Sequence, residues 1–277
     1  MTTLSMARST QAVTGLAVLL AVFYVIAQSW GFFLVVSTDI LFILISGATS
    51  ALALLVVLQG SKKEKTPWPH LAAKLRPVHI GLFLSVSLWF LGELTWGIYE
   101  IVLRVEISYP SVADIFYLAG YVPVLLSIFR FMWLFKKLVT PAKAAASGFT
   151  GLIVLGLSTV FVLEPLYNSP KDLITKGFDL AYPILDAVVV VLVAMRFITF
   201  ASTKIGKAWL WIFSGLFLQS IADILFSYGT LTGWYYSGHP IELLWLFGYL
   251  SLMLGFNGQR KEFSDKNVSE PITIAQA

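Results

Sequence analysis

The segment 38–59 reads TDILFILISGATSALALLVVLQ, and after Asp39 it contains no charged residue. A helix needs about 20 mostly apolar residues to cross the hydrocarbon core of a bilayer, which is roughly 30 Å thick. A helix also satisfies its own backbone hydrogen bonds, as a chain in lipid must. The segment therefore predicts a transmembrane helix, and the rest of the chain repeats its pattern.

Further runs of similar length and apolar character lie on both sides of this segment. They occupy 12–34, 78–104, 112–135, 148–166, 178–201, 208–231 and 239–258. The first run has the position of a signal peptide, but it stays apolar as far as Val36 and has no clear small-residue cleavage site. The sequence predicts an all-α polytopic membrane bundle of about eight transmembrane helices. This bundle is expected to be a single domain over 1–258, and 259–277 to be a polar, disordered cytoplasmic tail.

The composition agrees with a membrane protein. Of the 277 residues, 58% are hydrophobic and 12% charged, against roughly 45–50% and about 25% in soluble proteins. The chain has no cysteine, which excludes disulfides, thiolate metal sites and cysteine nucleophiles. The net charge of +4 is better explained by membrane topology than by nucleic-acid binding.

The basic residues predict the orientation. With the N-terminus in the cytoplasm, all of the 19 Lys and Arg residues except Arg104, Lys171 and Lys176 fall on the cytoplasmic side. This distribution follows the positive-inside rule, so both termini are expected inside and the protein in the cell membrane. Most of the 15 acids fall in the outer half instead. Because acids contribute little to topology, their position needs a structural or functional cause.

Two segments of the chain resemble each other. Residues 114–121, DIFYLAGY, align with 242–249, ELLWLFGY, so that an acid, an aromatic three residues later and a Gly-Tyr pair coincide. Weaker copies begin at Asp179 and Asp39. The simplest architecture that explains the pattern is a bundle of four helical hairpins in parallel repeat. Inverted repeats, which many transporters contain, are not what this spacing indicates.

The repeated acid has a structural interpretation. Ser111 is suited to be an N-cap with Asp114 as the third helical residue, a capping box, and Glu242 repeats the arrangement behind a proline. An acid there also meets the positive end of the helix dipole. The same capping role is predicted for Asp39 and Asp179.

Three stretches carry a resemblance to a known group of proteins. Residues 110–121 (PSVADIFYLAGY), 180–186 (LAYPILD) and 242–249 resemble the N-terminal membrane regions of bacterial multidomain signalling proteins. Those regions precede cyclic-di-nucleotide synthase and phosphodiesterase domains or kinase modules. The resemblance covers roughly 80–258 and implies a membrane sensor or scaffold module. Since only about twenty polar residues follow Gly258, signalling is expected to run through a separate membrane or cytoplasmic partner.

Ionisable residues inside the helices are the functional candidates, because each costs roughly 2.5–3.5 kcal/mol on insertion scales. Glu93 and Glu100 are seven residues apart and so share a face, and Arg104 follows Glu100 by four, which predicts an ion pair. On another helix, Asp223 follows Gln219 by four. Since Glu93 and Asp223 lie at similar depths, we expect both to face the interior and to come near each other.

Together these residues predict an outward-facing polar chamber for a cation, a proton or a small polar ligand. The candidate residues for this site are Glu93, Asp186, Asp223, Trp96, Gln219, Asp114, Glu164, Glu242, Tyr117, Tyr182 and Trp245. The competing interpretation is that the acids are caps and interhelical hydrogen-bond partners, and that the aromatic residues pack helices and line the membrane interface.

Other function classes find no support in the sequence. No Lys lies in a helix core to carry a retinal Schiff base, and the three His residues are too dispersed to converge on one metal. The chain has no nucleophile elbow, P-loop or metalloprotease helix. We therefore expect a non-enzymatic membrane sensor or accessory protein without a cofactor. A small cation-coupled transporter is the alternative, and the sequence leaves the oligomeric state open.

Overall fold

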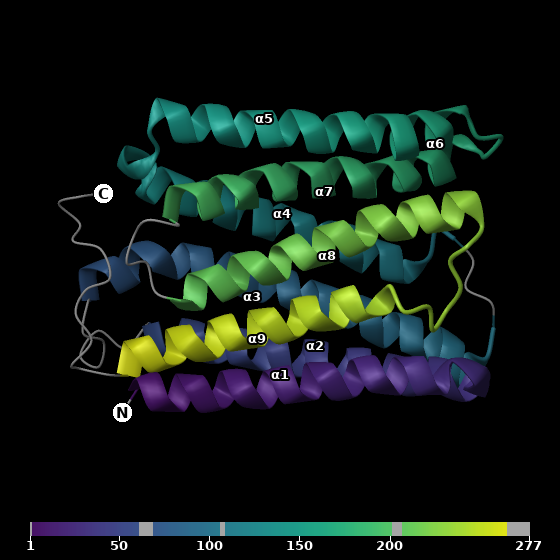
Figure 1. Ribbon diagram of the computed structural model, residues 1–277, viewed down its shortest axis with the longest axis horizontal. Helices are drawn as coiled ribbons and strands as arrows, with labels where there is room; N and C mark the ends of the chain where they lie inside the picture. The colour runs from purple at the N-terminus through teal and green to yellow at the C-terminus, as the bar shows by residue number, and fades with distance from the viewer. Residues whose placement is uncertain (1, 61–68, 106–108, 201–206, 265–277) are drawn as a thin grey trace.

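The computed structural model describes residues 2–60, 69–105, 109–200 and 207–264, which form helices and no strand. The long helices run side by side along one axis (Figure 1). They are α1 (Thr2–Ala27), α2 (Phe32–Gly60), α3 (Pro69–Gly97), α4 (Val112–Leu134), α5 (Pro141–Ser158), α7 (Leu173–Phe200), α8 (Lys207–Thr232) and α9 (Glu242–Ser264). The short helical segments are η1 (Gln28–Trp30), η2 (Ile98–Leu103), η3 (Lys136–Leu138), η4 (Thr159–Leu163) and α6 (Glu164–Asn168).

The helices have the dimensions of membrane spans. Within the described ranges, 7 segments are long and apolar enough to cross a bilayer, the first at Arg8–Trp30 and the last at Ala208–Thr232. The 23-residue α9 lies among them and is long enough, but its C-terminal part is polar. The prediction of an all-α polytopic bundle is confirmed, and the chain is an integral membrane protein.

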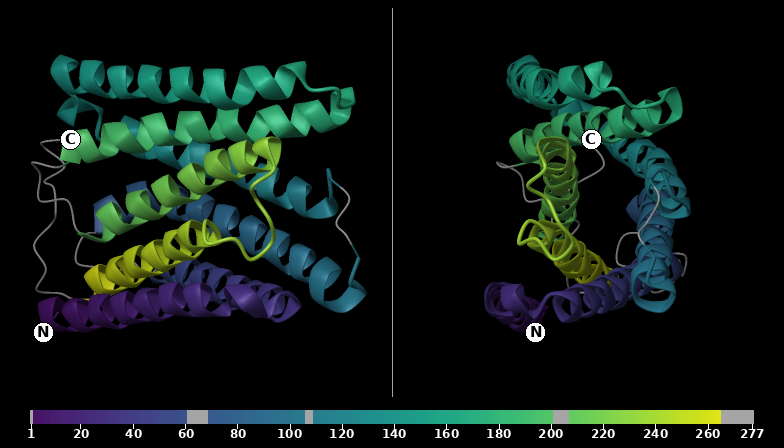
Figure 2. Two further views of the ribbon diagram at one scale, coloured as in Figure 1. Left: turned by 45° about the vertical axis from the view of Figure 1, so that its right-hand side comes forward. Right: turned by 90° about the vertical axis from the view of Figure 1, so that its right-hand side faces the viewer.

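Six helices form a closed ring. In order they are α2, α3, α4, α7, α8 and α9, each packed against the next, and α9 closes the ring against α2. Figure 2 shows this ring end-on. α2 therefore faces α7, α3 faces α8 and α4 faces α9. α1 packs outside the ring against α9, and α5 packs outside it against α7.

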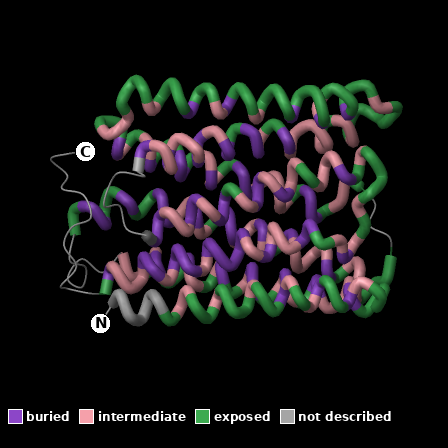
Figure 3. Tube along the Cα trace, viewed as in Figure 1, coloured by how far each residue is buried: buried purple, intermediate pink, exposed green. Residues whose placement is uncertain are grey.

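The buried residues lie mainly in the six helices of the ring, whereas α5 is exposed along almost its whole length (Figure 3). The α5 side chains Phe149 and Leu152 are 66% and 70% exposed. Apolar side chains pointing outward are expected of a helix in contact with lipid tails, which are as apolar as the side chains themselves.

The first predicted boundary was wrong. The sequence suggested one helix over 12–34 and a second from 38, but the chain turns at Gly31, where φ is 54°, and α2 begins at Phe32. A glycine adopts this left-handed conformation without steric cost, which explains the position of the turn. Asp39 therefore lies inside α2 and is buried rather than capping its start.

The predicted cap at Asp179 was also wrong. α7 begins at Leu173, and Asp172 accepts hydrogen bonds from the backbone N–H groups of Ile174 and Thr175 at 3.0 and 3.1 Å. Because Asp172 already satisfies these first amides, the helix starts one to two turns before Asp179. Asp179 forms an ion pair with Lys171 at 2.8 Å.

The predicted cap at the start of α4 is confirmed, and the cap predicted at the start of α9 is confirmed in part. Asp114 Oδ2 accepts a hydrogen bond from Ser111 N at 2.6 Å, within a capping box. Glu242 Oε1 accepts one from Gly238 N at 2.6 Å, but Glu242 is the first residue of α9 and not the third. Each carboxylate thus binds a backbone amide that lies just before its own helix.

The opposite end of the ring, where α3 and α8 begin, is closely packed. The Phe131 ring lies 4.8 Å from Phe135, 4.4 Å from Trp209 and 5.4 Å from Phe213, between ring centroids. α9 reaches this end and continues to Ser264, beyond the predicted end of the bundle at 258. The rest of the predicted tail, 265–277, lies outside the described residues.

Candidate functional site

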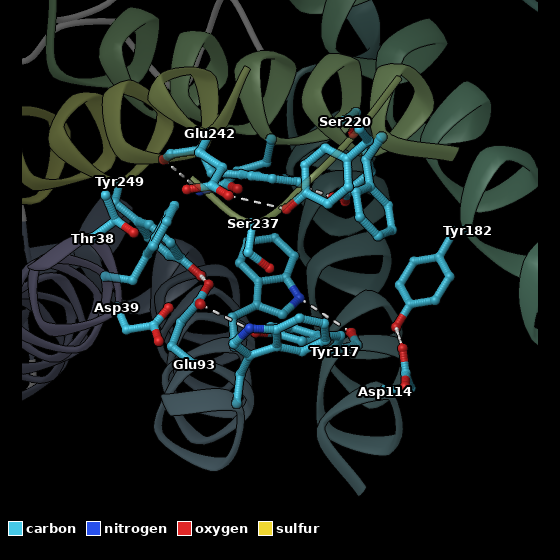
Figure 4. Close-up of a pocket in the computed structure, with 18 of the residues that line it drawn as sticks. Thr38, Asp39, Glu93, Asp114, Tyr117, Tyr182, Ser220, Ser237, Glu242 and Tyr249 are labelled. Carbon is cyan, nitrogen blue, oxygen red and sulfur yellow. Dashed lines mark hydrogen bonds between the residues drawn. The ribbon is translucent and has the colours of Figure 1, made fainter. Parts of the chain in front are cut away.

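The end of the ring at which α4 and α9 begin, which is the predicted outer end, contains a cavity with about 1150 Å³ of empty space, including open solvent at its mouth. Figure 4 shows the side chains that project into it from several helices. Seven of the lining residues are acidic, and none of the described residues that line it is Lys, Arg or His. The acids are Asp39, Glu93, Glu100, Asp114, Asp186, Asp223 and Glu242.

Glu93, on α3, is held between two tyrosines. Its Oε2 accepts a hydrogen bond from the Tyr117 hydroxyl on α4 at 3.1 Å. Its Oε1 accepts one from the Tyr249 hydroxyl on α9 at 2.9 Å. The carboxyl group is thereby fixed in the cavity wall, and the lone pairs that remain on its oxygens are available to a ligand.

Asp223, on α8, occupies the facing wall in a similar setting. Its Oδ1 accepts a hydrogen bond from Trp245 Nε1 at 2.7 Å. The Tyr121 hydroxyl lies 2.9 Å from its Oδ2 and 2.6 Å from Oδ1 of Asp186 on α7. A tyrosine hydroxyl has one proton to donate. The two carboxyl groups therefore compete for one donor unless one of them carries a proton.

The contacts of the α3 acid and the α8 acid correspond one to one. Each accepts one bond from the aromatic residue three positions after the capping acid of the next helix. Each accepts a second bond from the tyrosine of the other Gly-Tyr pair, on α9 for Glu93 and on α4 for Asp223. The correspondence continues one turn earlier in each helix. Trp89 Nε1 donates to Tyr117 O, and Gln219 Nε2 donates to Trp245 O, both at 3.2 Å.

Two further acids lie at the rim. Asp114 Oδ1 accepts a hydrogen bond from the Tyr182 hydroxyl at 2.9 Å. Glu242 accepts one from Tyr24 at 2.9 Å and one from Tyr235 at 3.1 Å. Burial, together with the adjacent Glu242 carboxylate, raises the pKa of Tyr235. This loop tyrosine therefore remains a protonated hydrogen-bond donor at neutral pH.

Some carboxyl oxygens in the lining have no hydrogen-bond donor among the described residues. These buried atoms are Oδ2 of Asp39, Oε2 of Glu100 and Oδ2 of Asp186. Asp39 is 7% exposed and Asp186 is 0% exposed. The Asp39 and Glu100 carboxyl groups contact each other. The Ser220 hydroxyl lies near Asp186, but it does not form a hydrogen bond with the Oδ2 atom. Such groups are costly unless a proton or a cation compensates them.

Within the described ranges, no three His, Asp or Glu side chains converge as the ligands of a metal ion would. The acids are instead distributed around the wall. Aromatic rings fill the intervals between them, including Trp89 and Trp96 on α3 and Trp245 on α9. The arrangement therefore resembles an extended anionic lining more than a compact coordination site.

The structure brings the predicted site residues together with one exception. Glu93, Asp186, Asp223, Trp96, Gln219, Asp114, Glu242, Tyr117, Tyr182 and Trp245 all line the cavity. Glu164 does not, because it lies exposed at the start of α6, outside the ring. The predicted depth of a residue along its helix does not tell which helices enclose the cavity.

The predicted ion pair between Glu100 and Arg104 is absent. Ser237 Oγ donates to Glu100 Oε1 at 3.1 Å, whereas the Arg104 guanidinium lies over the Phe32 ring, 5.5 Å from its centroid. The reason is the π-helical turn η2, Ile98–Leu103, which changes the spacing that would place residues four apart on one face.

The predicted approach of Glu93 to Asp223 is met only in part. Both side chains line the same cavity. They stand on facing helices, however, and each has its own pair of hydrogen-bond donors. The two carboxyl groups thus line the same cavity but have no hydrogen-bond donor in common.

Several lining residues were missed as site candidates. Asp39 was assigned to a cap because the start of α2 was misplaced, and Glu100 was assigned to an ion pair. Tyr121 was overlooked although it belongs to the Gly-Tyr pair of the repeated motif. Tyr235 and Ser237 come from the loop before α9, where apolar periodicity gives no signal.

Comparison of the chain with protein-family models, with curated proteins and with solved structures found no match.

Proposed function

We propose that this protein is a non-enzymatic sensor or accessory protein of the cell membrane, and that its outer cavity binds a small cationic ligand. The single observation that carries the proposal is the cavity lining, with seven acids, aromatic walls and no basic residue among the described lining positions. A carboxylate away from water is costly unless it is paired. A cation that enters the cavity supplies the missing charge.

The closed inner half favours a sensor over a carrier. The rings of Phe131, Trp209 and Phe213 pack together at the end of the bundle that is predicted to face the cytoplasm. A sensor needs a site open on one side only, whereas a carrier must expose its site to both sides in turn. The resemblance to membrane regions of signalling proteins supports the same proposal, with a separate partner that receives the signal.

A cation-coupled carrier is the second candidate, and one feature favours it. Prolines interrupt three of the ring helices, at Pro77 in α3, Pro123 in α4 and Pro183 in α7. A proline removes a backbone hydrogen bond and gives a helix a point at which it can bend. Bending at these points would open the inner half, as alternating access requires.

Ligand binding is the first test. Purified protein in nanodiscs is titrated with tetramethylammonium, short alkylammonium ions, Na⁺ and Ca²⁺, with tryptophan fluorescence and thermal stability as readouts. We expect organic cations to raise the melting temperature and to change the fluorescence of the cavity tryptophans. Glu93→Gln should weaken this response, and Glu164→Gln, outside the cavity, should leave it unchanged. Failure of all of these cations to bind would overturn the proposal.

Measuring cation transport across a membrane distinguishes the sensor from the carrier. The protein is reconstituted in sealed vesicles, and the cation that binds is supplied outside with and without a proton or sodium gradient. A sensor should bind the cation without accumulating it. Gradient-driven uptake that Glu93→Gln abolishes would establish the carrier and exclude the sensor.

The predicted orientation has its own test. Because the chain has no cysteine, single cysteines at Lys143 and Ser237 can be labelled in intact cells with a membrane-impermeant maleimide. Ser237→Cys should react from outside, and Lys143→Cys only after the cells are opened. Labelling of both positions from the same side would contradict the topology.

A further inference from the structure

Four of the seven acids that line the cavity form two pairs on facing walls. Asp39 on α2 and Glu100 on η2 contact each other on one side. On the other side, Asp186 on α7 and Asp223 on α8 lie around the single hydroxyl of Tyr121. Since α2 and α7 stand opposite each other in the ring, the two pairs are separated by the width of the cavity.

Both pairs have unsatisfied acceptors. Asp39 Oδ2 and Glu100 Oε2 lack donors on one side, and Asp186 Oδ2 lacks one on the other. Asp39 and Asp186 are both more than nine-tenths buried, and both face the cavity. Solvent reaches these oxygens poorly, so a proton or a bound cation must compensate them.

The wall between the pairs is aromatic. Trp89, Tyr117, Trp245 and Tyr249 all line the cavity, and their hydroxyl and indole N–H groups already bind protein acceptors. What remains available to a ligand is their ring faces. Ring faces contact methylene groups favourably and attract ammonium ions.

We propose that the ligand is a linear organic dication, a diamine or polyamine, with one ammonium group at each acid pair and its methylene chain along the aromatic wall. The inference rests on the proposed function and adds the class of ligand. An ammonium group has three donors, which suits the free lone pairs of two adjacent carboxyl oxygens. A single metal ion would need a compact ligand set, which the described residues do not form.

A monoamine should bind more weakly, because it leaves one acid pair without compensation. A hydrogen bond to a charged group contributes about 1.5–3 kcal/mol, which corresponds to roughly a 10- to 100-fold change in affinity. Diamines should therefore bind at least about tenfold more tightly than monoamines of the same length. Their affinity should also pass through a maximum at one chain length, since the distance between the pairs is fixed.

The test is a titration series on the complete protein in nanodiscs. Diamines with amino groups at both ends and chains of three to eight carbons are compared with n-alkylamines of the same lengths, by calorimetry and by tryptophan fluorescence. Asp39→Asn and Asp186→Asn each remove the charge of one pair member with little change of shape. Each should bring the affinity of the best diamine down to that of its monoamine. Glu164→Gln is the matched control and should keep the full difference.

The outcomes separate the two proposals. If diamines bind no more tightly than monoamines, the dication is wrong and the cationic site stands. If Ca²⁺ or Mg²⁺ binds and displaces every amine, the ligand is a metal ion and the dication is also wrong. If no cation binds, both proposals fail. The wild-type length series needs no variant, so a substitution that prevents folding does not remove the test.

Discussion

The two ends of the same six helices are built in opposite ways. At the inner end, Phe131, Phe135, Trp209 and Phe213 pack ring against ring and leave the bundle closed. At the outer end, aromatic rings are just as frequent, but carboxyl groups stand between them and the space stays open. The difference teaches that the same helical frame holds a closed aromatic core at one end and an acid-lined cavity at the other.

Close approach of neighbouring helices is not confined to the inner end. At Gly120 on α4, a Cβ atom would meet the Trp89 ring, whose Cδ1 lies at 2.6 Å, and at Gly255 on α9 it would meet the backbone of Ala208 at 2.9 Å. Small residues let transmembrane helices approach this closely. The two ends differ instead in how densely their side chains pack. Removing a side chain should thus affect stability most at the inner end and least at the outer rim.

The largest effect is expected at the inner end. Phe131→Ala should destabilise the protein by roughly 2–4 kcal/mol, because it leaves a cavity among buried rings. The loss of apolar transfer free energy is smaller than in water, since the unfolded helix remains in lipid. The measurement is unfolding in mixed micelles. Phe129→Ala on the same helix, at a side chain 50% exposed, is the control and should change stability by less than about 0.5 kcal/mol. Equal effects at both positions would contradict the comparison.

A smaller effect is expected where the packed end meets the cavity. Gly120→Ala forces the Trp89 ring to move and weakens its bond to Tyr117 O, at a cost of about 1–3 kcal/mol. Gly156→Ala on α5, which meets nothing within 4 Å, should instead stabilise by up to about 1 kcal/mol through helix propensity. Thermal unfolding of the two variants in one detergent should thus show shifts of opposite sign.

Side chains at the rim of the cavity should contribute less to stability than those at the inner end. Asp114→Ala removes the capping box and leaves the Tyr182 hydroxyl without its acceptor, at a cost of about 1–2 kcal/mol. Glu164→Ala, an exposed acid outside the ring, should cost under about 0.5 kcal/mol. Denaturant titration of both variants tests the difference, and an unchanged stability of Asp114→Ala would show that the cap is dispensable.

The smallest effect is expected in the outer loop before α7. The Thr175 hydroxyl and backbone amides of residues 174 and 175 lower the pKa of Asp172. A lowered pKa means that the cap stabilises the helix start above the ordinary pKa of aspartate, and that this contribution is lost as the pH falls through the lowered value. Amide hydrogen exchange should show Ile174 and Thr175 losing protection at acidic pH. In Asp172→Asn this pH dependence should disappear, whereas protection that persists at low pH would exclude the cap.

Much of the fold was predictable from the sequence, for physical reasons that act locally. A run of about 20 apolar residues must form a helix in lipid, so the existence of the spans followed from composition. The caps at Asp114 and Glu242 followed from residues within one turn. The caps assigned to Asp39 and Asp179 failed because Gly31 and Asp172 set the helix starts instead, and hydropathy does not mark such boundaries.

The sequence by itself also determined that acids and aromatic residues gather in one half of the bundle, because depth along a helix can be counted from its ends. Only the tertiary structure decided which of them meet. The order of helices in the ring brings Asp186 to Asp223 and places Glu164 outside, and the π-helical turn η2 separates Glu100 from Arg104. Ring order depends on packing between segments far apart in the chain, and such packing has no local signature in the sequence.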